Sequence, residues 1–183
     1  DFLVDLGMKR IKIPSGEITN HPFLRYLAAK DLPLILSTGM ATLQEIVEAT
    51  EVIRSERTCL GLTAPLESML TILHCTSNYP AAPDDVNLRA MGTIASELGV
   101  PVGYSDHTEG VEISIAAVAM GACVIEKHFT LDRKLPGPDH RASIEPAGLA
   151  ELVSAIRHVE MALGDGIKRP GASERRNIAV ARK

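Results

Sequence analysis

The chain has 183 residues, of which 45% are hydrophobic and 23% are charged, and its formal net charge is −4. This composition is typical of a globular domain and excludes a disordered, collagen-like or coiled-coil chain. Because basic residues are not in excess and only 3% of residues are aromatic, it also argues against a chain built to bind nucleic acid or anionic lipid.

The cysteines and the N-terminus indicate a cellular compartment. Cys59, Cys75 and Cys123 are odd in number and widely separated, and no two have the spacing of a metal or redox motif. This pattern favours reduced thiols, which are typical of the cytosol. No apolar run approaches the roughly 18 residues of a membrane span, and the N-terminus lacks the order of a signal peptide. We therefore expect a cytoplasmic protein.

Short apolar runs alternate with longer amphipathic segments along the chain. Near-continuous apolar runs of this length are typical of strands buried on both faces, as in a parallel sheet covered by helices. The expected strands are, in chain order, 10–13, 34–37, 69–75, 101–104 and 123–128.

The segments between these strands carry apolar residues at helical spacing. Thr42 and Glu45 have the spacing of a capping box, which predicts the start of one helix. Ser143 is a candidate cap for the last long helix, with Pro146 in its first turn. The expected helices run through 23–27, 43–53, 88–98, 111–119 and 149–163, the last three ended by Gly99, Gly121 and Gly164, and residues 2–7 have the pattern of a helix end.

Five strand–helix repeats predict parallel strands joined by helical crossovers. A doubly wound sheet and a closed barrel both satisfy this pattern, but no GxGxxG fingerprint occurs and polar residues follow every strand, which favours a barrel. A (β/α)8 TIM barrel needs about eight strands and about 250 residues. We therefore expect residues 1–166 to contain its last five strand–helix units without the first strands, and 167–183 to form a basic linker. Such a fragment, with open sheet edges, is expected to be inactive by itself.

Polar residues at the ends of the first two strands are candidate anion ligands. Lys12 lies among isoleucines, where it either points outward beneath a helix or binds an anion that offsets its desolvation. Ser15 and Glu17 follow at the next turn. Ser37, which begins a Ser-Thr-Gly turn after the second strand, either helps to cradle a phosphate or belongs to a helix cap.

The third strand ends in a polar segment that contains Ser77, Asn78 and Tyr79. A turn alone explains an asparagine next to Pro80, but a tyrosine beside it indicates the wall of a pocket. Cys75 is interpreted as a small core residue rather than a nucleophile, because no base is adjacent in sequence.

The fourth and fifth strands are each followed by a histidine, His107 and His128. The ends of neighbouring parallel strands lie close together, so this pair favours a divalent transition metal such as Mn²⁺, Fe²⁺ or Zn²⁺ over two structural histidines. Two protein ligands leave positions for water or substrate, as a Lewis acid requires. The proline-braced loop 135–141 presents Asp139 and is interpreted as a substrate-covering loop, although turn chemistry alone accounts for its prolines.

Six motifs together resemble the sialic acid synthase family, which comprises N-acetylneuraminate and legionaminate synthases. They follow the family's order over nearly the whole chain: KIPSGE (12–17), LILSTGMAT (34–42), HCTSNYP (74–80), VGYSDHT (102–108), VIEKHFTLDR (124–133) and LPGPDHRAS (135–143). The resemblance implies a TIM barrel that condenses phosphoenolpyruvate with an N-acetylated hexosamine, giving a nine-carbon acid and phosphate by C–O cleavage. The sugar, N-acetylmannosamine or a 2,4-diacetamido-trideoxyhexose, is not fixed by the sequence.

The same resemblance assigns roles to single residues. It implies Mn²⁺ held by His107 and His128, and catalytic roles for Glu17, Asp139 and His128, with Glu17 as the candidate base for the attacking water. Tyr79, Asp139 and Glu17 resemble the residues around the sugar. The implied phosphoenolpyruvate contacts are Lys12, Ser15, Ser37, Ser105, either Ser77 or Asn78, and a basic residue of the tail, for which Lys183 is the candidate. Full-length members are homodimers in which a C-terminal antifreeze-like domain, absent from this sequence, supplies an arginine to the partner's site.

Two other functions remain as alternatives. A metal-dependent barrel hydrolase or isomerase would use the histidine pair to activate water, and it would need a third protein ligand such as Glu126. A non-catalytic remnant would bind a sugar phosphate or a partner subunit. Fold analogy does not separate these from a synthase, because barrels host many chemistries.

Overall fold

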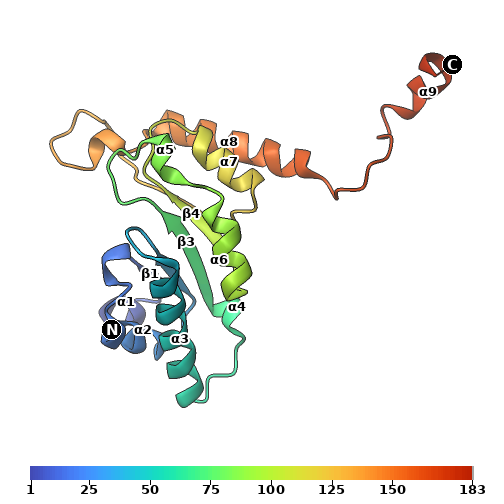
Figure 1. Ribbon diagram of the computed structural model, residues 1–183. Helices are drawn as coiled ribbons and strands as arrows, with labels where there is room; N and C mark the ends of the chain where they lie inside the picture. The colour runs from blue at the N-terminus through green and yellow to red at the C-terminus, as the bar shows by residue number, and fades with distance from the viewer. Residues whose placement is uncertain (183) are drawn as a thin grey trace.

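The computed structural model describes residues 1–182, in which five parallel strands form one sheet in the order β1-β2-β3-β4-β5 (Figure 1). A doubly wound sheet reverses its strand order at a switch point, whereas a β/α barrel adds each strand beside the previous one. The observed order is therefore that of a barrel, and it confirms the predicted fold class over these five units. The strands are β1 Ile11–Ile13, β2 Leu34–Ser37, β3 Leu70–Cys75, β4 Val102–Asp106 and β5 Ile125–Lys127.

Helices connect consecutive strands. The helix α2 packs against α3, while α6 and α7 pack on β4 and α7 packs against α8. At the C-terminal end, α9 stands away from the sheet beyond an extended segment (Figure 1). Within residues 1–182 no helix is both long and apolar enough to cross a membrane. The helices are α1 Phe2–Asp5, η1 Ser15–Glu17, α2 His21–Ala28, α3 Leu43–Cys59, α4 Leu66–Met69, α5 Pro83–Val86, α6 Ala90–Leu98, α7 Glu112–Ala119, η2 His140–Ala142, α8 Pro146–Leu163 and α9 Arg175–Ala181.

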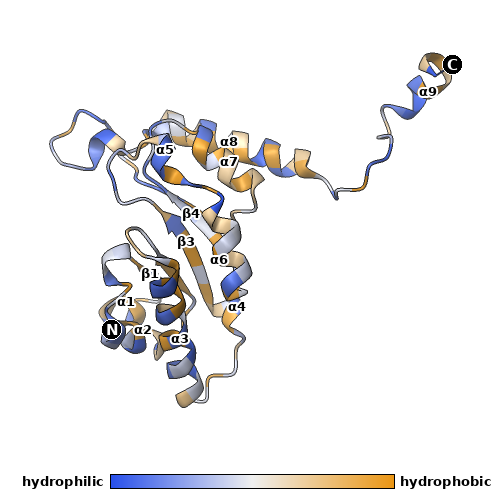
Figure 2. Cartoon of the chain, viewed as in Figure 1, coloured by the Kyte–Doolittle hydropathy of each residue, from blue (hydrophilic) through white to orange (hydrophobic). Residues whose placement is uncertain are grey.

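The core lies between the sheet and its helices. Ile13, Leu36 and Ile72 from the first three strands are fully buried and belong to one cluster with Leu24 of α2 and Ile53 of α3. Figure 2 shows hydrophobic colour on much of β3, while α6 carries hydrophobic and hydrophilic segments and the loop before α8 is largely hydrophilic. Lys12, between two buried isoleucines, points to the other face of β1. Burial of the outer face thus fixes which side chains face the barrel interior.

Most of the predicted helix signals are present. The Thr42 hydroxyl accepts a hydrogen bond from Glu45 N at 3.3 Å, and Glu45 Oε2 accepts one from Thr42 N at 2.7 Å. These bonds lower the pKa of Glu45. Gly99 ends α6 in the left-handed conformation, with φ +65°. The prediction that Ser143 caps α8 is wrong, because Glu145 occupies the N-cap position and the Ser143 hydroxyl donates to Asp139 O at 2.7 Å.

Gly103 lies in β4, between β3 and β5, where it has no room for a side chain. A methyl group there would collide with the carbonyl oxygen of Val124 and would lie 2.7 Å from Leu73 Cδ2. Because one of these atoms is backbone and the other belongs to a fully buried leucine, neither moves without disturbing the sheet.

We therefore expect Gly103→Ala to destabilise the protein by about 2 kcal/mol through overpacking. At roughly 2–4 °C per kcal/mol for a domain of this size, the thermal midpoint measured by circular dichroism should fall by about 4–8 °C. The control is Gly92→Ala on α6, where a methyl group meets no atom within 4 Å among the described residues, and it should be neutral or slightly stabilising. Equal midpoints for the two variants would show that β4 has more room than the structure indicates.

Candidate functional site

A cavity of about 520 Å³ lies at the carboxyl ends of the strands. All five strands or the turns that follow them contribute to it, which is the usual place for the active site of a β/α barrel. A larger cavity of about 640 Å³ lies between α3 and α6, but it lacks the paired histidines and the lysine. The residues that line the smaller cavity include Lys12, Ser15, Ser37, Cys75, Ser77, Tyr79, Ser105, His107, Glu126 and His128.

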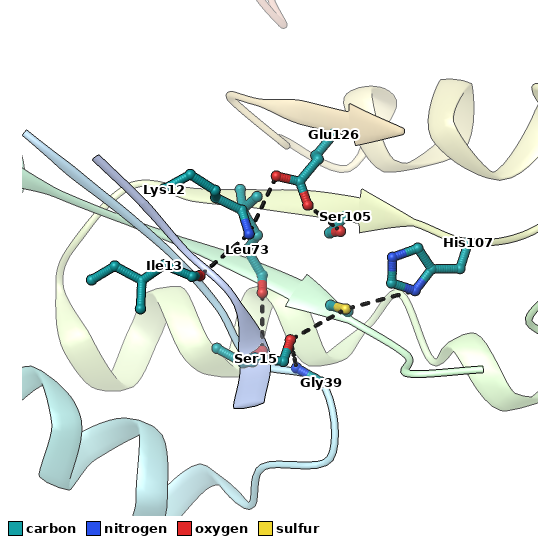
Figure 3. Close-up of polar contacts among 10 residues, drawn as sticks. Lys12, Ile13, Ser15, Gly39, Leu73, Ser105, His107 and Glu126 are labelled. Atoms are coloured by element: carbon teal, nitrogen blue, oxygen red, sulfur yellow. Dashed lines mark hydrogen bonds and ion pairs between the residues drawn. The ribbon is translucent and has the colours of Figure 1, made fainter. Parts of the chain in front are cut away.

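Lys12 and Glu126 meet across this cavity (Figure 3). Their Nζ and Oε2 atoms are 3.3 Å apart, and each side chain is 34% exposed. Lys12 also donates to Ile13 O at 3.2 Å, and Glu126 Oε1 accepts from the Ser105 hydroxyl at 2.7 Å. Lys12 comes from β1 and Glu126 from β5, so the sheet curls until side chains of its first and last strands touch. Lys12 therefore faces the cavity and not the helices.

Serine hydroxyl groups line the same cavity as the lysine. The Ser15 hydroxyl accepts from Gly39 N at 2.8 Å and lies 3.7 Å from the Cys75 thiol. Ser37 is 2% exposed, and its hydroxyl has no hydrogen-bond partner in the described part of the chain. An unpaired buried hydroxyl is costly unless a ligand completes it. Together with the lysine, these groups form a site suited to an anion.

Gly39 keeps this site open. A methyl group at Gly39 would collide with the Ser77 hydroxyl and would lie 3.0 Å from the Ser15 hydroxyl and 3.1 Å from the Cys75 sulfur. The absence of a side chain therefore lets the turns after β1, β2 and β3 converge. This is the structural reason for the glycine in the predicted Ser-Thr-Gly turn.

The two histidines lie side by side, with ring centroids 5.1 Å apart and ring planes at 87°. His107 Nδ1 is 2.6 Å from Thr76 O. A carbonyl only accepts, so Nδ1 carries the proton and the neutral ring keeps a lone pair on Nε2. That tautomer fits a metal ligand. No group of three or more His, Cys, Asp or Glu residues suited to a metal ion occurs within residues 1–182.

Tyr79 covers the histidines. Its ring centroid is 4.2 Å from that of His107 and 5.3 Å from that of His128. Burial raises the pKa of Tyr79, and Cys75, Asp139 and Glu126 nearby raise this pKa further. The phenol therefore stays protonated at neutral pH, as a hydrogen-bond donor at the cavity wall.

Three of the predicted residues lie outside the cavity lining. Glu17 Oε2 accepts from Asn20 Nδ2 at 2.7 Å behind η1, and Asn78 is exposed with its Oδ1 accepting from Tyr79 N at 3.1 Å. Of the pair left open by the sequence, it is thus Ser77 that lines the cavity. Asp139 lies at the rim, 57% exposed and 3.9 Å from His128 Nδ1. Lys183 lies outside the described residues.

Sequence reasoning considered Glu126 only as a third metal ligand for a hydrolase. The structure instead engages it with Lys12 and Ser105. The sequence did indicate that Glu126 faces the cavity, because it lies two residues before His128 and residues two apart on a strand share a face. The carbonyl of Thr76 left no comparable signal, since backbone atoms carry no residue identity.

Comparison with known proteins identifies the relatives of this chain. It is 53% identical over 183 residues to N,N'-diacetyllegionaminic acid synthase of Legionella pneumophila, covering all of this chain and 50% of that protein. It is 51% identical to the Campylobacter jejuni protein of the same name, covering 53% of it, and 40% identical over 169 residues to human N-acetylneuraminate-9-phosphate synthase, covering 92% of this chain and 44% of that protein. The chain thus spans about half the length of these relatives.

Solved structures agree with this relationship. The crystal structure of an N-acetylneuraminic acid synthetase from Leptospira borgpetersenii, in complex with citrate, matches 97% of this chain and 59% of that one, with a TM-score of 0.84 and 39% identity. A truncated 3-deoxy-D-arabino-heptulosonate 7-phosphate synthase from Thermotoga maritima matches with a TM-score of 0.72 at 20% identity, which supports the fold alone. A family model described as the NeuB family matches residues 1–168. Because this match includes the entire sheet and every residue that lines the cavity, the chain belongs to the NeuB family.

Proposed function

We propose that the protein containing this chain is a nonulosonic acid synthase, which condenses phosphoenolpyruvate with an N-acetylated hexosamine. The observation that carries the proposal is one cavity in which a lysine, a group of serine hydroxyls and a histidine pair converge. Support comes from the two relatives above 50% identity, both named N,N'-diacetyllegionaminic acid synthase. They favour a 2,4-diacetamido-trideoxyhexose over N-acetylmannosamine as the sugar.

In this proposal, the anionic groups of phosphoenolpyruvate bind to Lys12 and the surrounding hydroxyls. Lys12 is paired with Glu126, so an incoming phosphate or carboxylate takes the place of the glutamate beside the lysine ammonium. Ser37 supplies a hydroxyl that has no protein partner within residues 1–182. Charge-assisted hydrogen bonds of this kind are about twice as strong as neutral ones. Ser15, Ser77 and Ser105 complete the set.

His107 and His128 would hold the divalent metal, most favourably Mn²⁺. When bound, this ion acts as a Lewis acid that polarises the aldehyde oxygen of the open-chain sugar. The chain's own task is to present two neutral imidazoles, and the bond from His107 Nδ1 to Thr76 O sets the tautomer of one of them. A hydrolase that uses three protein ligands is not favoured, because Glu126 is already bound to Lys12 and Ser105.

The reaction forms a bond between the enol carbon of phosphoenolpyruvate and the aldehyde carbon of the sugar. Water then adds to the resulting cation, and phosphate leaves with cleavage of its C–O bond. The Tyr79 phenol and the Asp139 carboxylate are placed to orient sugar hydroxyls. We retain Glu17 as the base that takes the proton of the water. To act, Glu17 must give up its hydrogen bond with Asn20. Glu126, which lies inside the cavity, is the other candidate carboxylate.

The remaining parts of the proposal concern the whole protein. We place it in the cytoplasm as a homodimer in which a C-terminal antifreeze-like domain completes the partner's site. A basic residue of the tail, Lys183 or a neighbour, would contact the phosphate. Support for these parts comes from membership of the family alone.

Phosphate release by the full-length protein tests the function directly. With Mn²⁺ and phosphoenolpyruvate, phosphate should appear only when an N-acetylated hexosamine is added, and faster with a 2,4-diacetamido-trideoxyhexose than with N-acetylmannosamine. Reaction in ¹⁸O-labelled water should place the label in the sugar acid and not in phosphate, because the C–O bond breaks. No release with either sugar, or label in the phosphate, contradicts the proposal.

The histidine pair is expected to determine metal dependence. His107→Ala/His128→Ala should abolish Mn²⁺-dependent turnover, because both imidazole ligands are lost. His158→Ala, which removes an exposed histidine of α8, is the matched control and should turn over normally. The measurement is initial rate against Mn²⁺ concentration. A double variant that keeps full metal-dependent turnover would contradict the assignment of the two histidines as metal ligands.

Lys12 is expected to recognise the more highly charged substrate. Lys12→Met should raise the KM for phosphoenolpyruvate by about 10–100-fold, the equivalent of losing one hydrogen bond to a charged group, while the KM for the sugar changes much less. Lys9→Met, at an exposed position just before β1, should change neither KM. If only the KM for the sugar rises, the assignment of Lys12 to phosphoenolpyruvate is wrong.

A further inference from the structure

A buried ion pair lies directly behind the two histidines. Lys127 Nζ is 2.9 Å from Asp106 Oδ2, and their side chains are only 4% and 0% exposed. The two residues are register partners at the carboxyl ends of β5 and β4. Each immediately precedes one histidine of the cavity, and because strand side chains alternate, the pair points away from the cavity toward α7.

Both members of the pair make further hydrogen bonds within the protein. Asp106 Oδ2 also accepts from the Ser114 hydroxyl of α7 at 2.5 Å, and Oδ1 accepts from Thr108 N and Thr108 Oγ1 at 2.8 and 2.7 Å. Lys127 Nζ donates to Thr108 O at 2.7 Å as well. Lys127 therefore binds both residues that flank His107 in sequence, while it is itself the neighbour of His128.

Stability alone is a weak reason for such a pair. Removing two charges from water is costly, and apolar residues of similar size often serve a protein core as well or better. What a hydrogen-bonded ion pair provides, and an apolar contact does not, is one fixed arrangement of the two backbone segments that carry it. Here the two segments are the ends of β4 and β5, directly before His107 and His128.

The contact lies at the end of a short strand. The strand β5 has only three residues, and within residues 1–182 it pairs with β4 alone. Its last register pair is Lys127 with Asp106. The His107 ring is held by the Thr76 carbonyl, whereas in the described structure no hydrogen bond holds the His128 ring. The position of His128 relative to His107 therefore depends on its backbone, which is held through Lys127 on one side and by the hydrogen bond from Ile144 N to His128 O at 2.8 Å on the other.

We propose that Asp106 and Lys127 are positioning residues that fix the separation of the His107 and His128 imidazoles for one divalent metal. The inference rests on the proposed role of these histidines as metal ligands. It adds a cause for their spacing: the ion pair on the far face of the sheet ties β5 to β4 at the level of the metal site. Groups that hold metal ligands from behind typically change metal affinity by about 10–100-fold when altered.

The test is Mn²⁺ binding by the full-length protein without substrates, followed by the electron paramagnetic resonance signal of the free ion. Asp106→Asn/Lys127→Met removes both charges together, so that neither is left buried alone. We expect its Kd for Mn²⁺ to rise at least about tenfold. The control is Arg57→Met, which breaks the ion pair that the buried Arg57 makes at 3.0 Å with the exposed Asp31 near the far end of α3. This variant should lower the thermal midpoint without changing the Kd.

The outcomes separate this proposal from the function on which it rests. If the unaltered protein binds no Mn²⁺, the metal assignment and this inference both fall. If it binds Mn²⁺ and the folded double variant binds with unchanged affinity, the positioning role is wrong and the histidine site stands. If the double variant does not fold, Ser114→Ala decides, since it removes one hydrogen bond to Asp106: a Kd raised about threefold or more supports the inference, and an unchanged Kd overturns it.

Discussion

In a strand, alternate side chains point to opposite faces of the sheet, and this constraint organises both the site and its support. On β4 and in the residues that follow it, Ser105 and His107 face the cavity while Asp106 faces α7. Glu126 and His128 face the cavity from β5, and Lys127 lies behind them. Because the two strands pair in register, the inward residues meet one another and so do the outward ones. The residues proposed to contact substrate and the residues proposed to position them thus lie on opposite faces of one sheet.

The ion pair of the cavity remains partly accessible to solvent. Lys12 is neutralised by Glu126, and both side chains stay partly exposed, so neither bears the full cost of an unpaired buried charge. The Asp106–Lys127 pair is the opposite case, since it is nearly inaccessible to solvent and bound to neighbouring protein groups. In the proposed function, the accessible pair opens for an anionic substrate, while the buried pair stays closed. One ion pair joins β5 to β1 and the other joins β5 to β4, and the two differ in exposure.

Local signals in the sequence predicted most of the fold. The capping box of Thr42 and Glu45 and the glycine at the end of α6 depend on a few adjacent residues, and the five apolar runs depend on the period of a buried strand. The Ser143 cap failed because that hydroxyl binds the carbonyl of Asp139 instead. The partners of Glu126 and the Asp106–Lys127 pair were missed for a different reason. Both depend on strand register and on the curl of the sheet, which no short segment of sequence specifies.

The contact between Lys12 and Glu126 also bears on the order in which the molecule folds. It joins the first strand of the described sheet to the last, so its two residues are among the most widely separated in sequence of any pair in contact. Closing so long a loop carries a large entropic penalty until the strands between are in place. We therefore expect this contact to form late, after β2, β3 and β4 have docked. An incompletely folded or still-emerging chain then has no assembled cavity at these strand ends.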